Sequence, residues 1–255
     1  MRSALSTLLR PAVFPALLLG ALEAYTRTAG AQSDALAPPS AAALALGRAA
    51  LDGSLWQASL FTLGSAALGL LIGALLGGLL GIVLGLSDRA ARLGFLSVEV
   101  LRPVPSVALI PLAMLVFGFG LRMEISVVAF ACLWPMAMLT QAAAQQVEPR
   151  LLEVARALQM NAWQRFAWIV GPAMVPRLFV ALRLGVAIAL VVAVTVEIAA
   201  NPNGMGYAMM IAQQSLDPAL MLAWLLWIGV VGFAINAAAT WVQQRVARRM
   251  GEGRP

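Results

Sequence analysis

A stretch without any charged side chain runs from residue 53 to residue 87, and it constrains the fold more than any other feature. Its apolar part, residues 59–86, exceeds the roughly 20 apolar residues that a helix needs to cross a bilayer. Further apolar runs cover residues 103–121, 125–144, 178–199 and 219–242. No alternating period of two recurs, so we predict helices rather than barrel strands. The predicted fold class is all-α, a polytopic transmembrane helical bundle.

Composition supports a membrane setting and excludes several kinds of chemistry. Hydrophobic residues make up 62% of the chain and charged residues 11%, against about 45–50% and about 25% in soluble domains. The chain has no His and no Lys, which excludes His-based metal sites, Ser-His triads and the Lys of a Walker A loop. The single Cys132 excludes an internal disulfide. We predict no catalytic residue, no metal site and no cofactor bound by this chain.

The N-terminal segment is open to two interpretations. Residues 11–25 are apolar but short, and arginines precede them. They form either a retained span, which gives six spans in all, or a secretory signal cleaved near residues 29–31, which leaves five. We divide the chain into an N-terminal span with an extracytoplasmic loop (1–58), a membrane core (59–245) and a basic tail (246–255).

The arginines predict the orientation of the spans. With six spans and the N-terminus inside, all arginines except Arg27, Arg48 and Arg122 fall on the cytoplasmic side, Arg102 among them. The acidic residues divide almost evenly between the two sides. Only the basic residues are therefore biased, as the positive-inside rule expects. The net charge of +6 indicates topology rather than a nucleic-acid partner, and both termini are predicted to be cytoplasmic.

The longest polar segment on the predicted cytoplasmic side covers residues 145–176. Pro149 favours the start of a first short helix. Asn161, with Gln164 three residues later, predicts a capping box that begins a second one. Both helices are amphipathic, so from the residues alone the pair either docks a partner or lies on lipid headgroups.

This segment resembles the EAA loop of ABC importer permeases. Glu153, Val154 and Ala155 stand at that family's Glu-Ala-Ala, and Pro172 stands at its final Pro. Gln159 replaces the family's Gly, which lets the chain turn left-handed, and Gly171 replaces its Leu. We expect that turn at Gln159 or at Asn161. The resemblance implies that the loop docks an ATPase through Glu153, Ala155, Arg156, Leu158, Asn161 and Gln164.

Two other segments extend the resemblance to residues 59–242. One is the Arg102-Pro103-Val104-Pro105 run with residues 109–111 and 117–120, and the other is residues 196–198 with residues 204–207. The resemblance is closest to the nitrate, sulfonate and taurine branch. It implies a type I importer permease in the bacterial inner membrane, which moves a small anion inward by alternating access.

The same resemblance implies a set of partners. A second copy of the chain would complete the pathway as a homodimer, and two ATPase subunits would bind ATP and Mg. A periplasmic substrate-binding protein would deliver the solute. This division of labour agrees with the missing Lys, because such a permease needs no phosphate loop.

Other residues are candidates for the solute pathway or for helix packing. Glu197 either lines the outer pathway or anchors the loop that follows it. Pro105, Met210, Gln213 and Gln214 are further pathway candidates. The ladder Gly69, Gly73, Gly77, Gly81 and Gly85 predicts close helix packing, either static or as a sliding seam.

Two alternatives belong to other classes. An ion-gradient-driven secondary transporter or channel needs acids along its path, and the predicted spans have almost none at mid-span. A membrane enzyme would need a catalytic group, and the sequence shows neither a carboxylate pair nor a metal-ligand cluster. Co-purification with an ATPase would separate the importer from both alternatives.

Overall fold

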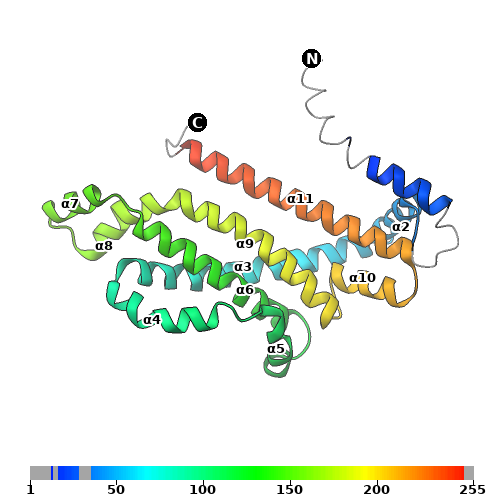
Figure 1. The fold of residues 1–255 in the computed structure, drawn as a ribbon, viewed down its shortest axis with the longest axis horizontal. Coiled ribbons are helices and arrows are strands. Elements are labelled where there is room, and N and C mark those ends of the chain that lie inside the picture. The colour runs from blue at the N-terminus through cyan, green and yellow to red at the C-terminus, as the bar shows by residue number, and fades with distance from the viewer. Residues whose placement is uncertain (1–12, 14–16, 29–35, 250–255) are drawn as a thin grey trace, which may run out of the picture.

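The computed structural model describes residue 13 and residues 17–28 and 36–249, in which every regular element is a helix. Four helical segments there are long and apolar enough to cross a membrane. They are α3 (Ser54–Leu86), α6 (Leu121–Gln145), the continuous segment Ala162–Ala199 that contains α9 (Gly171–Ala199), and α11 (Pro218–Arg249). These helices lie along the long axis of the molecule (Figure 1). The predicted all-α bundle is confirmed.

The first predicted span, residues 11–25, falls partly on residues 1–12 and 14–16, which lie outside the described part of the chain. Residues 17–27 are helical. The basic tail also lies outside, apart from residues 246–249. The choice between six and five spans therefore stays a prediction.

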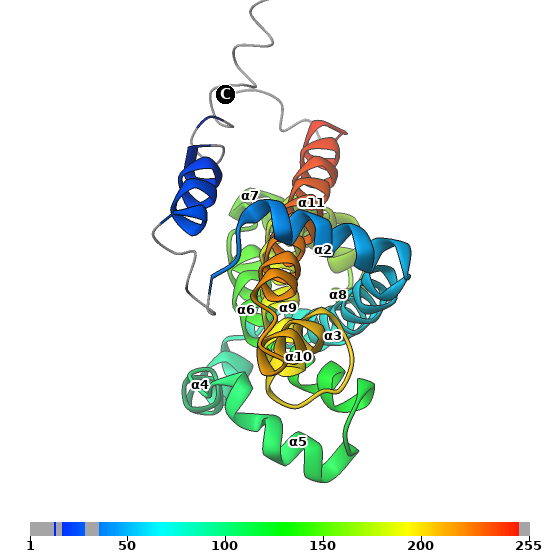
Figure 2. The same cartoon turned by 90° about the vertical axis from the view of Figure 1, so that its right-hand side faces the viewer.

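The span predicted over residues 103–121 is wrong in its bounds. The structure has α4 (Asp88–Leu101) followed by a short 3-10 turn (Ser106–Leu109) and α5 (Ile110–Phe117), and the two parts are bent by 81°. Figure 2 shows α4 end-on and α5 running across it. Pro103 and Pro105 explain the break, because proline lacks an N–H and disfavours helix in the residue before it.

The break also determines where Arg102 lies in the fold. The 14 residues of α4 rise about 21 Å from Asp88, where the chain has just left α3. In Figure 1, α4 runs beside the long helices rather than across their ends. Arg102 therefore lies at the bend between α4 and α5, and its assignment to the cytoplasmic side stays a prediction.

Helices α3 and α6 pack backbone to backbone through the glycine ladder. A Cβ atom at Gly69, Gly73, Gly77, Gly81 or Gly85 would overlap atoms of α6 in each case. A Cβ atom at Gly78, on the other side of α3, would have no neighbouring atom within 4 Å. The predicted close packing is confirmed, and the contact lies within one chain.

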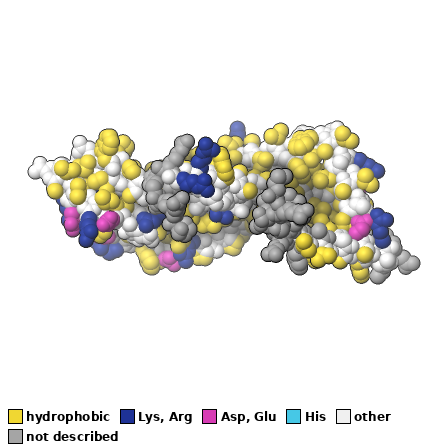
Figure 3. All heavy atoms as spheres, turned by 90° about the horizontal axis from the view of Figure 1, so that it is seen from above, with side chains coloured by type: hydrophobic (Ala, Val, Ile, Leu, Met, Phe, Trp, Pro, Cys, Tyr) yellow, Lys and Arg dark blue, Asp and Glu magenta, His cyan; other side chains and the backbone are white. Residues whose placement is uncertain are grey.

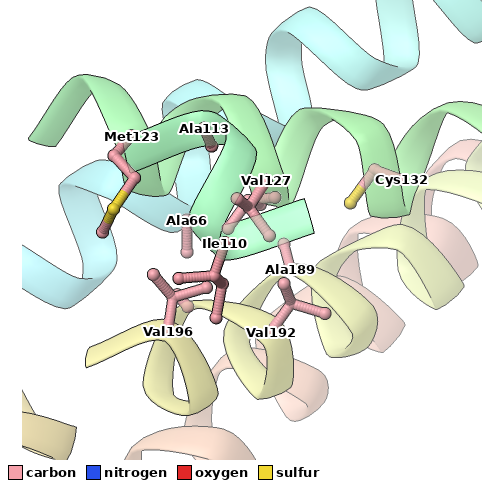
Figure 4. Packing of buried hydrophobic residues seen from close by; sticks show 11 residues of the cluster. Ala66, Ile110, Ala113, Met123, Val127, Cys132, Ala189, Val192 and Val196 are labelled. Carbon is pink, nitrogen blue, oxygen red and sulfur yellow. The ribbon is translucent and has the colours of Figure 1, made fainter. Parts of the chain in front are cut away.

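Helices α5, α6 and α9 share the main hydrophobic core. Ile110 of α5 lies among Val127 of α6 and Val192 and Val196 of α9, with Ala66 of α3 close by (Figure 4). All five side chains are buried. This core fixes the lateral helix α5 against the bundle and so sets the position of the break before it.

Short helices gather at the two ends of the bundle. At one end lie α7 (Pro149–Ala157) and α8 (Ala162–Arg165), and at the other lie α2 (Pro39–Leu51) and α10 (Met205–Gln214) (Figures 1 and 2). Between the ends, hydrophobic side chains cover much of the face in Figure 3. Many of them are large and exposed, as expected for a surface that meets lipid or another apolar surface.

Candidate functional site

The end of the bundle that carries α7 and α8 is held by its own hydrophobic cluster. Val147, Val170 and Met174 are buried there, and Leu152 and Phe166 pack against them. Ala155 of α7 is 1% exposed, so its small side chain is buried at this end of the bundle. The cluster packs α7, through Leu152, against the ends of α6 and α9.

The opposite side of the same loop is exposed. Glu153, Arg156, Leu158, Asn161 and Gln164 all lie on the surface. Leu158 and Trp163 are 66% and 74% exposed, so two large apolar side chains lie on this surface beside the polar ones. Of the six residues predicted to couple to an ATPase, the structure therefore exposes five and buries Ala155 beneath them.

The turn between the two short helices is left-handed at Gln159, whose φ is +52°. This is the position where the family pattern has Gly, so the backbone shape is kept without the glycine. Asn161 then caps α8: its side chain accepts from the Gln164 N–H, and the Asn161 N–H donates to the Gln164 side chain. The predicted capping box is confirmed.

The sequence suggested that the second short helix is a separate element, and the structure shows that it is not. Helix α8 continues through a π-helical segment, Phe166–Val170, directly into α9. A π-helical turn lets one extra residue enter a continuous helix. The second short helix of the loop and the long membrane helix α9 are therefore one continuous helical segment.

A second cluster, fully buried and polar, lies at the other end of the bundle. Its side chains come from four segments and are at most 1% exposed. They are Thr62 and Ser65 of α3, Glu124 of α6, Glu197 of α9 and Asn201 after it. Ser65 and Asn201 donate to the two carboxyl oxygens of Glu124. The Glu197 carboxyl lies close enough to that of Glu124 to interact with it.

Glu197 connects this polar cluster to α10. Its Oε2 accepts a 2.8 Å hydrogen bond from the Gly206 N–H, and Thr62 accepts one of 2.9 Å from the Met205 N–H. Both N–H groups belong to the first turn of α10, which has no intrahelical partners for them. The left-handed Gly204 (φ +95°) lets the loop pass the Glu197 carboxyl, because a Cβ there would overlap it.

Sequence reasoning missed this pairing of two carboxyls. It considered Glu197 alone, did not single out Glu124 and found no carboxylate pair, and the structure corrects that statement. The signal in the sequence was that both acids stand one turn or less from a span end on the same side of the membrane. Nothing in their spacing indicated which helices are neighbours.

The remaining pathway candidates lie apart from each other. Met210 is half-buried on α10, whereas Gln213 and Gln214 are exposed, and Gln214 contacts the Met210 sulfur at 2.7 Å. Pro105 is exposed at the break, between Val104 and Ser106. Those two neighbours line an open cavity of about 480 Å³ between the broken span, α6 and α9. The residues that line this cavity do not include Met210, Gln213 or Gln214.

Comparison with known proteins defines the class of the molecule. Residues 69–252 match the family model described as the binding-protein-dependent transport system inner membrane component. The fold is similar to that of a chain in an inward-facing MetNI methionine ABC transporter, with a TM-score of 0.65 at 17% identity over 74% of this chain and 92% of that one.

Individual permeases from other organisms are similar in sequence to this chain. A protein named as the putative aliphatic sulfonates transport permease SsuC of Bacillus subtilis is 32% identical over 182 residues, which cover 71% of this chain and 66% of that protein. The riboflavin transport system permease protein RibX of Chloroflexus aurantiacus is 33% identical over 233 residues, 91% of this chain and 87% of that protein. Permeases named for taurine and nitrate are also among the relatives.

The chain is a membrane-embedded permease subunit of an ABC importer. More particularly, it belongs to the binding-protein-dependent transport system inner membrane component family, in the branch that contains the nitrate, sulfonate and taurine permeases. The secondary-transporter alternative is not favoured. Members of this family are membrane subunits rather than catalytic ones.

Proposed function

We propose that the exposed side of α7 and α8 docks a separate ATPase subunit and passes its movement to the membrane helices. The observation that carries this proposal is the two-sided loop: Ala155 is buried against the bundle, while Glu153 and Arg156 one turn apart are exposed. A loop that only lay on lipid headgroups would present its large apolar side chains toward one lipid-facing side. Here Leu158 and Trp163 are exposed beside charged and amide groups, as at the core and rim of a protein interface.

The direct link from the loop into α9 supports a mechanical role. Helix α8 runs without interruption through Phe166–Val170 into α9, so a push on α7 and α8 reaches the membrane core. ATP and Mg are bound by the partner in this proposal. The spans then alternate between inward-facing and outward-facing states.

Charge reversal on the docking side tests the proposal in the reconstituted complex. Glu153→Arg and Arg156→Glu should each abolish solute-stimulated ATP hydrolysis and uptake, because each places a like charge against the partner. Arg89→Glu is the matched control, since Arg89 is exposed near the same end of the bundle but on α4. Unchanged stimulation in both loop variants would contradict docking here.

We further propose the rest of the assembly and its solute class. Two copies of the chain form the pathway in the bacterial inner membrane with both termini cytoplasmic, and a periplasmic binding protein delivers the solute. The solute is a small anion such as a sulfonate. The relatives named for sulfonates, taurine and nitrate support this class, whereas the relative RibX is named for riboflavin, a compound of another kind.

A further inference from the structure

The cavity beside the broken span combines one charge with apolar walls. Its lining residues come from the break (Arg102, Val104, Ser106), from α6 (Phe130, Ala131, Trp134, Pro135, Met138, Leu139) and from α9 (Ile188, Val192). At about 480 Å³ it lies in the usual range of small-molecule sites, about 300–1,000 Å³. Arg102 is the one charged side chain among these described residues.

Arg102 occupies an unusual place for a cation. It stands about 21 Å along the broken span, and its side chain is 40% exposed. A charged side chain within a membrane avoids hydrocarbon, and it faces a water-filled space or another charged group. Its ion pair with Glu99, one turn back on α4, is 3.5 Å long and half-exposed, so this contact holds the guanidinium only weakly. Its Nη1 also lies 3.4 Å from the Met138 sulfur, a weak acceptor, and the other N–H groups of the guanidinium stay available to a ligand.

Other polar groups in the wall are also incompletely bonded. Trp134 is 8% exposed, and its indole N–H has no acceptor among the described residues. Pro135 has no N–H to give to the carbonyl of Ala131, one turn earlier on α6. Ser106 adds a hydroxyl at the start of the 3-10 turn. Discontinuous membrane helices often surround solute sites for this reason.

We propose that this cavity is a solute site in the membrane core, in which Arg102 binds the sulfonate head of a short organic sulfonate and the α6 and α9 walls hold its carbon chain. A guanidinium fork matches the oxygens of such a head group. Phe130, Met138 and Ile188 provide apolar surface that a carbon chain fills and nitrate does not. The site rests on the proposed importer function and specifies where its solute binds.

A single cysteine in the cavity provides a test that does not depend on transport. The native Cys132 is buried, so Ser106→Cys creates the accessible thiol. The full chain, assembled with its ATPase in nanodiscs, is labelled with N-ethylmaleimide, with and without ethanesulfonate, dimethyl sulfone or nitrate. Ethanesulfonate should slow the labelling most, nitrate less, and the uncharged sulfone not at all.

The role of Arg102 is tested in the same background. Arg102→Gln should weaken protection by ethanesulfonate by about tenfold or more, the usual loss when one charge-assisted hydrogen bond is removed. Arg183→Gln is the matched control, because Arg183 bonds Asn236 at 3.4 Å and does not line the cavity. Equal protection in Arg102→Gln, or equal protection by the sulfone, would overturn the proposal.

Two further outcomes separate this proposal from the importer function. If the Ser106→Cys thiol resists labelling without any solute, the second copy or the chain itself fills the cavity, and the solute site is overturned. If solute-stimulated ATP hydrolysis is absent from the unmodified complex, the proposed coupling fails while the labelling result still stands. Arg102→Gln should lower sulfonate uptake, whereas Arg183→Gln should leave both uptake and basal ATP hydrolysis unchanged.

Discussion

The carboxyl groups of Glu124 and Glu197 lie together in a sealed part of the bundle, although they come from α6 and α9. Both side chains are 0% exposed. Glu124 receives hydrogen bonds on both oxygens, whereas Glu197 receives one on Oε2 and has no donor for Oε1 among the described residues. The pair therefore connects α3, α6, α9 and α10. Within the described part of the chain, its Glu197 Oε1 is the carboxyl oxygen that lacks a hydrogen-bond donor.

This shortage predicts a difference between two substitutions of Glu197. Glu197→Gln keeps an acceptor for the Gly206 N–H and adds an amide N–H facing Glu124, so we expect unchanged or higher stability. Glu197→Ala leaves the Gly206 N–H without an acceptor and creates a cavity. We expect it to lower the free energy of unfolding by about 2–4 kcal/mol. Thermal unfolding of the solubilised protein measures both. A Gln variant as unstable as the Ala variant would contradict the hydrogen-bond count.

The glycine ladder between α3 and α6 predicts that alanine substitutions at two neighbouring glycines have different effects. Gly77→Ala should lower the folded yield and the unfolding temperature, because its Cβ would overlap the Leu133 carbonyl of α6. Gly78→Ala meets nothing within 4 Å and should be neutral or slightly stabilising, by up to about 1 kcal/mol. Size-exclusion profiles and unfolding temperatures compare the two. Equal behaviour would mean that α3 and α6 do not pack closely along this face.

The left-handed Gln159 predicts that glycine improves the local backbone at the turn. A non-glycine residue in this region costs about 1–2 kcal/mol, and glycine removes that cost at some loss of chain entropy. We expect Gln159→Gly to slow amide exchange in α7 and Gln159→Val to speed it. Hydrogen exchange followed by mass spectrometry measures these rates. Slower exchange with Val would show that the turn is not left-handed in solution.

The capping box predicts the effect of changing Asn161. Asn161→Ala removes the acceptor for the Gln164 N–H and should destabilise the start of α8 by about 1 kcal/mol. Asn161→Asp keeps that acceptor and serves as the control. Amide exchange over residues 162–166 reports the local change. If the two variants exchange alike, the cap does not hold α8.

The lowered pKa of Asp52 predicts a local effect of acidification at the start of α3. Hydrogen bonds from Ser54 hold the pKa of Asp52 below its usual value. A lowered pKa in the folded state means that this contact is intact above the ordinary carboxyl pKa and is lost as the pH falls through the folded value. Because Asp52 is exposed, we expect Asp52→Asn to change only local exchange near residues 52–56, measured by amide exchange at pH 7.

Much of the fold follows from local sequence. The length of an apolar run determines whether a helix spans a bilayer, so the runs behind α3, α6, α9 and α11 were predictable. The capping box at Asn161 and the interruption by Pro103 and Pro105 are also local, because they depend on missing or supplied backbone hydrogen bonds. The resemblance in the loop added the family and the docking residues.

Tertiary structure alone decided which distant residues meet. Three features depend on how helices pack and bend: the position of Arg102 at a cavity, the pairing of Glu124 with Glu197, and the continuity of α8 with α9. Hydropathy treats a span as one straight helix, so it did not predict the 81° bend beside Arg102. The sequence determined which segments enter the membrane, since burial of apolar surface is a property of each segment. The packing determined which polar groups share a site, since their contacts join segments far apart in the chain.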